Sequence, residues 1–191
     1  SFAGNLAKND NVGVFFGIGA GGGLYNTGNL KMTSCSFSNN FSETLDADPF
    51  SGGFGGGIAN EGALTLENCS FSDNSVNNLG LGGAIYNFYN HTMNITGGTF
   101  TTNYAFEGGG IHNEGTSNIA DSTFSNNEGL ARGGGIRNGS NLTVTGSIFT
   151  DNKSSDGGGI SNYYGTTVVA NSTFANNTAG DGGGIYNRYF L

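Results

Sequence analysis

The sequence repeats itself along its whole length, and this repetition constrains the fold more than any other feature. A block of the form Gly-Gly-Gly/Ala-Ile/Leu-x-Asn starts at Gly21, Gly55, Gly82, Gly108, Gly133, Gly157 and Gly182. A second block, Phe-x-x-Asn, starts at Phe2, Phe37, Phe71, Phe100, Phe124, Phe149 and Phe174. A unit of about 25 residues is too small to bury its own apolar face, so it must stack on copies of itself.

Between the two blocks, apolar residues alternate with polar ones. They stand seven and five places before the Phe in four of the repeats, as Leu30 and Met32, Leu64 and Leu66, Met93 and Ile95, and Leu142 and Val144. A period of two is typical of a strand with one buried face. We therefore predict an all-β fold, a right-handed parallel β-helix of about seven coils of roughly 25 residues, forming a single domain over residues 1–191.

In such a helix, equivalent residues of successive coils form columns about 4.8 Å apart. The predicted aliphatic column is Leu24, Ile58, Ile85, Ile111, Ile136, Ile160 and Ile185, and the seven Phe form an aromatic one. A third column, in which side-chain amides bond from coil to coil, is Asn26, Asn60, Asn87, Asn113, Asn138, Asn162 and Asn187. These three columns are the expected core.

The Gly blocks have two interpretations. Gly permits a positive φ at a tight corner, and it also leaves a smooth face on which another backbone can pack, as between neighbouring rods. Two connections are longer than the rest, and we expect expanded corner loops at about 3–20 and 38–54, where ligand-binding segments are commonly found.

Composition excludes several classes of protein. Gly makes up 37 of the 191 residues without recurring at every third position, so the chain is not collagen. The net charge of -8 disfavours nucleic acid as a partner. No run of about 18 apolar residues is present, so we expect no insertion into a membrane.

Charged residues that precede the Gly blocks are the best candidates for chemistry. Glu107, Arg132, Asp156 and Asp181 should stack in successive coils, either as a catalytic carboxylate cluster of a polysaccharide lyase or hydrolase or as a solvated ladder. We favour the ladder and assign no catalytic residue. His112 and Arg137 are expected on the outer surface. Two Cys give no zinc site, and we expect no metal and no cofactor.

Cys35 and Cys69 each stand two places before a ladder Phe, so they should be neighbours in consecutive coils. The two Cys form either a pair of buried thiols or a disulfide, and both interpretations remain open. Directly stacked strands are a strained place for a disulfide. Among the Asn-x-Ser/Thr sequences, Asn68, Asn94 and Asn171 lie outside the core columns and are the better candidates for glycosylation.

Aromatic residues gather just beyond the Asn column. They either cover the corner of the rod or form a contact surface for a sugar or a protein, and they are Phe88, Tyr89, Tyr163 and Tyr164.

The paired GG[A/G][I/L] and FxxN tetrapeptides resemble the repeats of chlamydial polymorphic outer membrane proteins. They are also similar to those of the wider set of right-handed parallel β-helix repeat surface proteins. Gly83, Ala84 and Ile85, followed by Phe100 to Asn103, are a good example. The resemblance covers essentially the whole chain. It implies a secreted adhesin or structural rod at the cell surface and supplies no active site.

We expect no polar caps on the terminal coils, which leaves strand edges able to recruit other chains. The leading hypothesis is therefore an extracellular rod that assembles head to tail with copies of itself into a filament or surface layer. Its contacts would come from Phe2, Asn5, Ile185, Asn187, Tyr189, Phe190 and Leu191. The alternative is an adhesin segment that binds a carbohydrate or a host surface.

Overall fold

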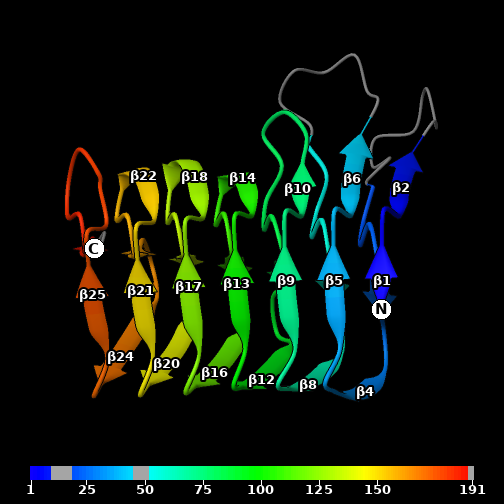
Figure 1. The fold of residues 1–191 in the computed structure, drawn as a ribbon, viewed down its shortest axis with the longest axis horizontal. Coiled ribbons are helices and arrows are strands. Elements are labelled where there is room, and N and C mark those ends of the chain that lie inside the picture. Colours follow the sequence, from blue (N-terminus) through cyan, green and yellow to red (C-terminus); the bar gives the residue numbers. More distant parts are fainter. Residues whose placement is uncertain (10–18, 45–51, 189–191) are drawn as a thin grey trace.

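The computed structural model describes residues 1–9, 19–44 and 52–188. All the regular elements in these ranges are short β-strands, and strands of successive coils pair in parallel. Figure 1 shows the coils stacked side by side into a rod, with equivalent strands in line. The prediction of an all-β parallel helix is confirmed.

Two sheets take one strand from each of seven coils. Sheet A consists of β1 (Phe2–Ala3), β5 (Ser36–Ser38), β9 (Ser70–Ser72), β13 (Thr99–Thr101), β17 (Thr123–Ser125), β21 (Ile148–Thr150) and β25 (Thr173–Ala175). Sheet C consists of β3 (Leu24–Asn26), β7 (Ile58–Asn60), β11 (Ile85–Asn87), β15 (Ile111–Asn113), β19 (Ile136–Asn138), β23 (Ile160–Asn162) and β26 (Ile185–Asn187). Sheet A carries the Phe-x-x-Asn blocks and sheet C carries the Gly blocks.

Two further sheets contain six strands each. Sheet D consists of β4 (Asn29–Thr33), β8 (Ala63–Glu67), β12 (Thr92–Thr96), β16 (Thr116–Ala120), β20 (Asn141–Thr145) and β24 (Thr166–Ala170). Sheet B consists of β2 (Leu6–Asn9), β6 (Phe41–Thr44), β10 (Ser75–Val76), β14 (Tyr104–Glu107), β18 (Glu128–Arg132) and β22 (Lys153–Asp156). Sheet D is the alternating apolar segment that the sequence predicts.

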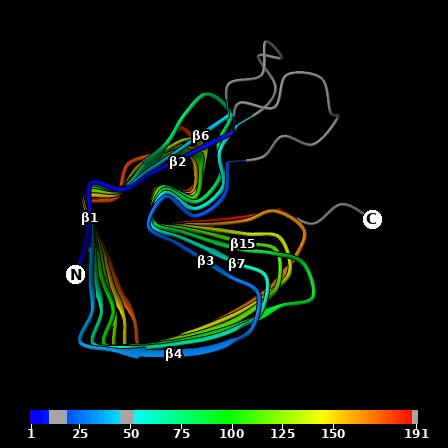
Figure 2. The same cartoon turned by 90° about the vertical axis from the view of Figure 1, so that its right-hand side faces the viewer.

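Sheet B is the unexpected element. In the view along the rod, sheets A, D and C enclose the interior, and sheet B extends from the end of sheet A beside sheet C (Figure 2). The prediction of expanded loops at 3–20 and 38–54 is therefore partly wrong. Each of these segments contains a strand of sheet B, β2 in the first and β6 in the second. The rest of those loops, residues 10–18 and 45–51, lies outside the described residues.

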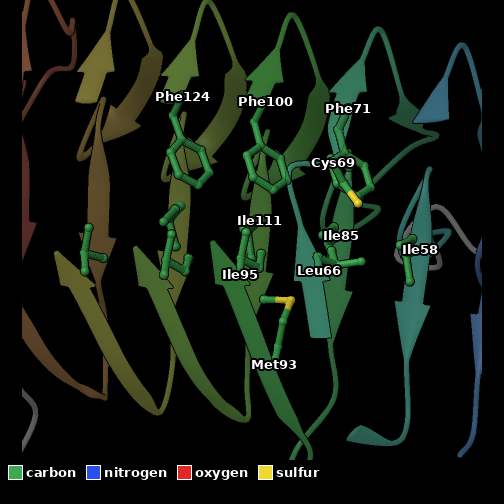
Figure 3. Close-up of a cluster of buried hydrophobic side chains, with 14 of the residues drawn as sticks. Ile58, Leu66, Cys69, Phe71, Ile85, Met93, Ile95, Phe100, Ile111 and Phe124 are labelled. Atoms are coloured by element: carbon green, nitrogen blue, oxygen red, sulfur yellow. The ribbon is translucent and has the colours of Figure 1, made fainter. Parts of the chain in front are cut away.

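The predicted core columns are confirmed. The seven Phe rings stack face to face along sheet A with centroid separations of 4.5–4.9 Å. The Ile column of sheet C and the alternating residues of sheet D pack beside them, and from Ile58 to Ile160 the Ile side chains are fully buried (Figure 3). The interior is a set of apolar columns that run along the rod.

Two Asn ladders frame this apolar interior. The predicted one, from Asn26 to Asn187, is linked by amide-to-amide hydrogen bonds of 2.7–2.9 Å. A second ladder uses the last residue of each Phe-x-x-Asn block, from Asn5 to Asn177, with bonds of 2.8–3.0 Å. Buried amides thus satisfy one another from coil to coil, which is the condition for burying polar groups at low cost.

Sheet B also explains the paired glycines. The first Gly of each block turns the chain with a positive φ, as at Gly133 (+64°). A Cβ on the second, Gly134, would lie 2.6 Å from the backbone N and O of Lys153 in sheet B and 2.5 Å from the carbonyl oxygen of Gly158. Both interpretations of the Gly block apply, but the backbone that packs on it belongs to the same chain rather than to a neighbouring rod.

No helix among the described residues is long and apolar enough to cross a membrane.

Candidate functional site

Sheet B turns the outer side of sheet C into a concave corner. Three columns of side chains line this B–C corner. The outward residues of sheet C are Tyr25, Ala59, Tyr86, His112, Arg137, Ser161 and Tyr186. The column at the end of sheet B is Ala20, Phe54, Leu81, Glu107, Arg132, Asp156 and Asp181. The residues that follow the ladder Asn are Thr27, Glu61, Phe88, Glu114, Gly139, Tyr163 and Arg188.

The predicted stacking of Glu107, Arg132, Asp156 and Asp181 in successive coils is confirmed. Their environments differ, however, because Glu107 is buried while Asp181 is exposed. Arg132 Nη1 contacts Glu107 Oε1 at 2.6 Å. This column therefore begins with an internal ion pair between Glu107 and Arg132 and ends with the solvated carboxylate of Asp181.

The expectation that His112 and Arg137 lie on the outer surface is wrong. Both point away from the β-helix interior, but sheet B covers them, and the exposed fractions are 1% for His112 and 7% for Arg137. The sequence pattern of sheet C correctly gives the direction of these side chains. It cannot show that a second layer lies over them.

These residues form one charged network in the B–C corner. Glu107 Oε2 lies 3.2 Å from Arg137 Nε and 4.0 Å from His112 Nδ1. Glu114 Oε1 lies 3.0 Å from His112 Nε2 and also pairs with Arg137 Nη1. With Arg132, the network contains two carboxylates, two guanidinium groups and one imidazole. Its charges therefore balance only if His112 is neutral.

The hydrogen bonds fix how His112 is protonated. Its Nε2 donates to the carboxylate of Glu114, and its Nδ1 is buried without a partner among the described residues. Burial, followed by the charge of Arg137, lowers the pKa of His112 below its usual value of 6.5. Burial alone would raise the pKa of Glu114, but the hydrogen bond from His112 and the charge of Arg137 outweigh it and lower this pKa.

Acidification should therefore destabilise the protein through His112. Because its folded-state pKa lies below 6.5, the unfolded state binds more protons, and the free energy of unfolding falls as the pH drops below about 6.5. The slope is at most about 1.4 kcal/mol per pH unit for one proton. Urea denaturation between pH 7.5 and 5.0 measures it, and the His112→Gln variant should flatten the curve. An unchanged slope in this variant would contradict the assignment.

Aromatic rings fill the corner beside the charged network. Tyr86 stacks on the ring of His112 at 5.0 Å and meets Phe54 and Phe88 edge to face at 4.7 and 4.4 Å. Burial, followed by the charge of Glu114, raises the pKa of Tyr86 above its usual value. On the other side of the network, the guanidinium of Arg132 lies 3.8 Å from the centre of the Tyr163 ring.

The predicted aromatic contact surface is divided by the structure. Phe88 packs against Tyr86 in the corner and is half-buried, and Tyr163 is half-buried beside Arg132. Tyr89 and Tyr164 are exposed by 70% and 55%. The four residues therefore do not form one surface.

The terminal coils continue the ladders. Phe2 stacks on Phe37 at 4.6 Å, Asn5 donates to Asn40, and Asn187 accepts from Asn162. Ile185 is 41% exposed in the last described coil. Tyr189, Phe190 and Leu191 lie outside the described residues.

The candidate modification sites lie at distinct positions. Asn68 and Asn171 stand at exposed corners with positive φ, and Asn94 is exposed on sheet D, where it accepts a hydrogen bond from Asn118. Cys35 and Cys69 are free thiols. Each donates to the carbonyl two residues earlier, as the equivalent Ser122 does, so the thiols occupy positions of a serine column.

Sequence reasoning missed Glu114, Glu61 and Tyr25 as residues of the B–C corner. The signal was present, because Glu114 and Glu61 directly follow ladder asparagines and Tyr25 stands between two ladder residues. Within the described ranges, no three His, Cys, Asp or Glu side chains are placed to hold a metal ion.

The comparisons with known families agree with this architecture. The family described as "Right handed beta helix region" matches residues 5–179. The chain belongs to this family. The repeat described as "Chlamydia polymorphic membrane protein (Chlamydia_PMP) repeat" matches residues 171–188, which include the last Gly block. No curated protein and no solved structure matches the chain. The fold and the similarity to a surface-protein passenger repeat are thus shown.

Proposed function

We propose that this β-helix is an extracellular structural rod at a cell surface and that it stacks head to tail with further copies of itself. The observation that carries the proposal is the continuity of the ladders into the terminal coils. At about 4.8 Å per coil, the seven strands of sheet C span roughly 29 Å, and each coil repeats the hydrogen-bonding groups of the one before it.

In this proposal, another coil stacks on the last described one. A hollow of about 470 Å³ opens there, lined by Val169, Ile185, Asn162 and Asn187 among others. The aliphatic and amide columns both reach this hollow, and Ile185 is partly exposed in it. At the opposite end, Phe2 and Leu24 present the aromatic and aliphatic columns. The two end faces are therefore chemically complementary.

Electron microscopy and sedimentation velocity over a range of protein concentrations test this assembly. The unaltered chain should form rods that lengthen with concentration, and Ile185→Lys and Phe2→Lys should disperse them, because a charge would be buried at the junction. Leu130→Lys is the matched control, since Leu130 is 44% exposed on β18, which lies between β14 and β22 and away from the ends. Dispersed single rods at every concentration would overturn the proposal.

A second function, adhesion, is supported by the family likeness to passenger repeats and by the exposed rings of Tyr89 and Tyr164. Catalysis is not part of the proposal, because the residues most suited to acid–base chemistry, Glu107 and His112, are buried under sheet B. The same rod can serve as a scaffold for binding sites on its outer faces.

A further inference from the structure

Two shallow hollows meet at Glu61 near the first coils of the rod. One, of about 310 Å³, lies in the B–C corner and is lined by Ala20, Tyr25, Glu61 and Phe88. The other, of about 340 Å³, lies on the connections between sheets C and D, and Glu61 lines it as well. A single carboxylate is thus shared by two neighbouring recesses, each of a size found for small ligands.

The first hollow has aromatic walls and one carboxylate. The ring of Tyr25 is 48% exposed, and Glu61 lines the same hollow. Phe88 is held in place by Phe54 and Tyr86, at centroid distances of 5.6 and 4.4 Å. An exposed ring beside an anchored one offers apolar faces on which a flat, weakly polar ligand can pack.

The second hollow is polar and is shaped by a longer connection. Four residues separate the ladder Asn87 from Thr92, whereas two separate Asn113 from Thr116. The additional residues form a turn in which Asn90 has a φ of +66°. They bring Asn90 and His91 to the hollow beside Thr92, so its lining offers an amide, an imidazole and a hydroxyl.

We propose that the paired hollows around Glu61 bind a neutral oligosaccharide, with one sugar ring against Tyr25 and Phe88 and the next beside Asn90 and His91. Sugars combine apolar ring faces with hydroxyl groups, and the two hollows supply aromatic faces and hydrogen-bonding groups in that order. The Glu61 carboxylate accepts hydrogen bonds from sugar hydroxyl groups. This site is distinct from the end-to-end assembly proposed above. Tyr25 lies on the terminal strand β3 but points outward, and Glu61 and Phe88 belong to later coils.

The charges favour a neutral sugar over an acidic one. No Lys or Arg is found among the described residues that line either hollow, while Glu61 is common to both. The chain as a whole carries a net charge of -8. A uronate or sialate would therefore approach a carboxylate without a cation to offset the repulsion.

Calorimetric titration with six probes tests the site: the hexasaccharides of cellulose, starch, xylan, laminarin and chitin, and hexagalacturonate as the acidic one. We expect at least one neutral probe to bind and hexagalacturonate to bind at least tenfold more weakly. Glu61→Gln should weaken neutral binding by about tenfold or more, since hydrogen bonds to charged groups are stronger than those to neutral ones. Tyr25→Ala should weaken it similarly through the lost ring contact.

Tyr104→Ala is the matched control, because Tyr104 is an exposed ring on β14 that lines neither hollow and should leave binding unchanged. Thermal unfolding of each variant shows that the fold is retained. The proposal is overturned if none of the neutral probes binds, if Glu61→Gln and Tyr25→Ala bind as well as the unaltered chain, or if hexagalacturonate binds more tightly than every neutral probe.

Discussion

Replacing Phe149 by alanine should lower the free energy of unfolding by about 3–5 kcal/mol, the range measured for buried Phe→Ala substitutions. Phe149 is fully buried and stacks between Phe124 and Phe174 at 4.6 and 4.7 Å. Its removal leaves a gap in the column that the neighbouring coils cannot close, because their backbones are fixed by sheet A. Urea denaturation followed by circular dichroism measures the loss.

The adjacent residue provides the control. Ile148 lies on the same strand, β21, but points outward and is 47% exposed. Ile148→Ala should cost less than about 1 kcal/mol, since much of its apolar area is already in water. If both substitutions cost the same, the period of two that places Phe149 inside and Ile148 outside would be incorrect.

Replacing Asn127 by alanine should cost about 2–5 kcal/mol. The Asn127 side chain accepts from the backbone N and Nδ2 of Asn103 and donates to the Phe100 carbonyl and to Asn152. Without the Asn127 amide, the Asn103 backbone N–H and the Phe100 carbonyl oxygen each lose a hydrogen-bond partner inside the rod. Each unsatisfied buried group costs about 1–3 kcal/mol.

Asn126 is the matched residue for this test. It precedes Asn127, is exposed, and has a φ of +54°. Asn126→Gly keeps the left-handed conformation accessible and should change the free energy of unfolding by less than about 1 kcal/mol. Equal losses for the two variants would show that the asparagines act through backbone conformation rather than through the ladder.

The columns of the interior were predictable because they depend on local rules. Spacing between the Phe and Gly blocks sets the coil length, and alternation sets which residues face inward. Leu64 and Leu66, for instance, are buried as their period of two requires. The second Asn ladder was not predicted, although its members recur at the same spacing as the fourth residue of each Phe-x-x-Asn block.

The B–C corner could not be predicted by these rules. The residues of sheet B differ from coil to coil, with Val76, Ala105, Gly129 and Ser154 at equivalent depths, so they show no common apolar pattern. Small side chains suffice there because the partner is the glycine backbone, which leaves room for little else. A strand that packs against glycine lacks the alternation by which strands are recognised.

The sequence by itself determined the β-helix, its period and its inner columns, since every repeat contains the same residues at the same spacing. Only the tertiary structure decided the environment of the outward residues. His112 and Arg137 alternate as surface residues should, yet sheet B removes them from water and joins them to Glu107 and Glu114. Alternation fixes the direction of a side chain relative to its own sheet, whereas burial depends on what lies beyond it, and that is a property of the folded chain.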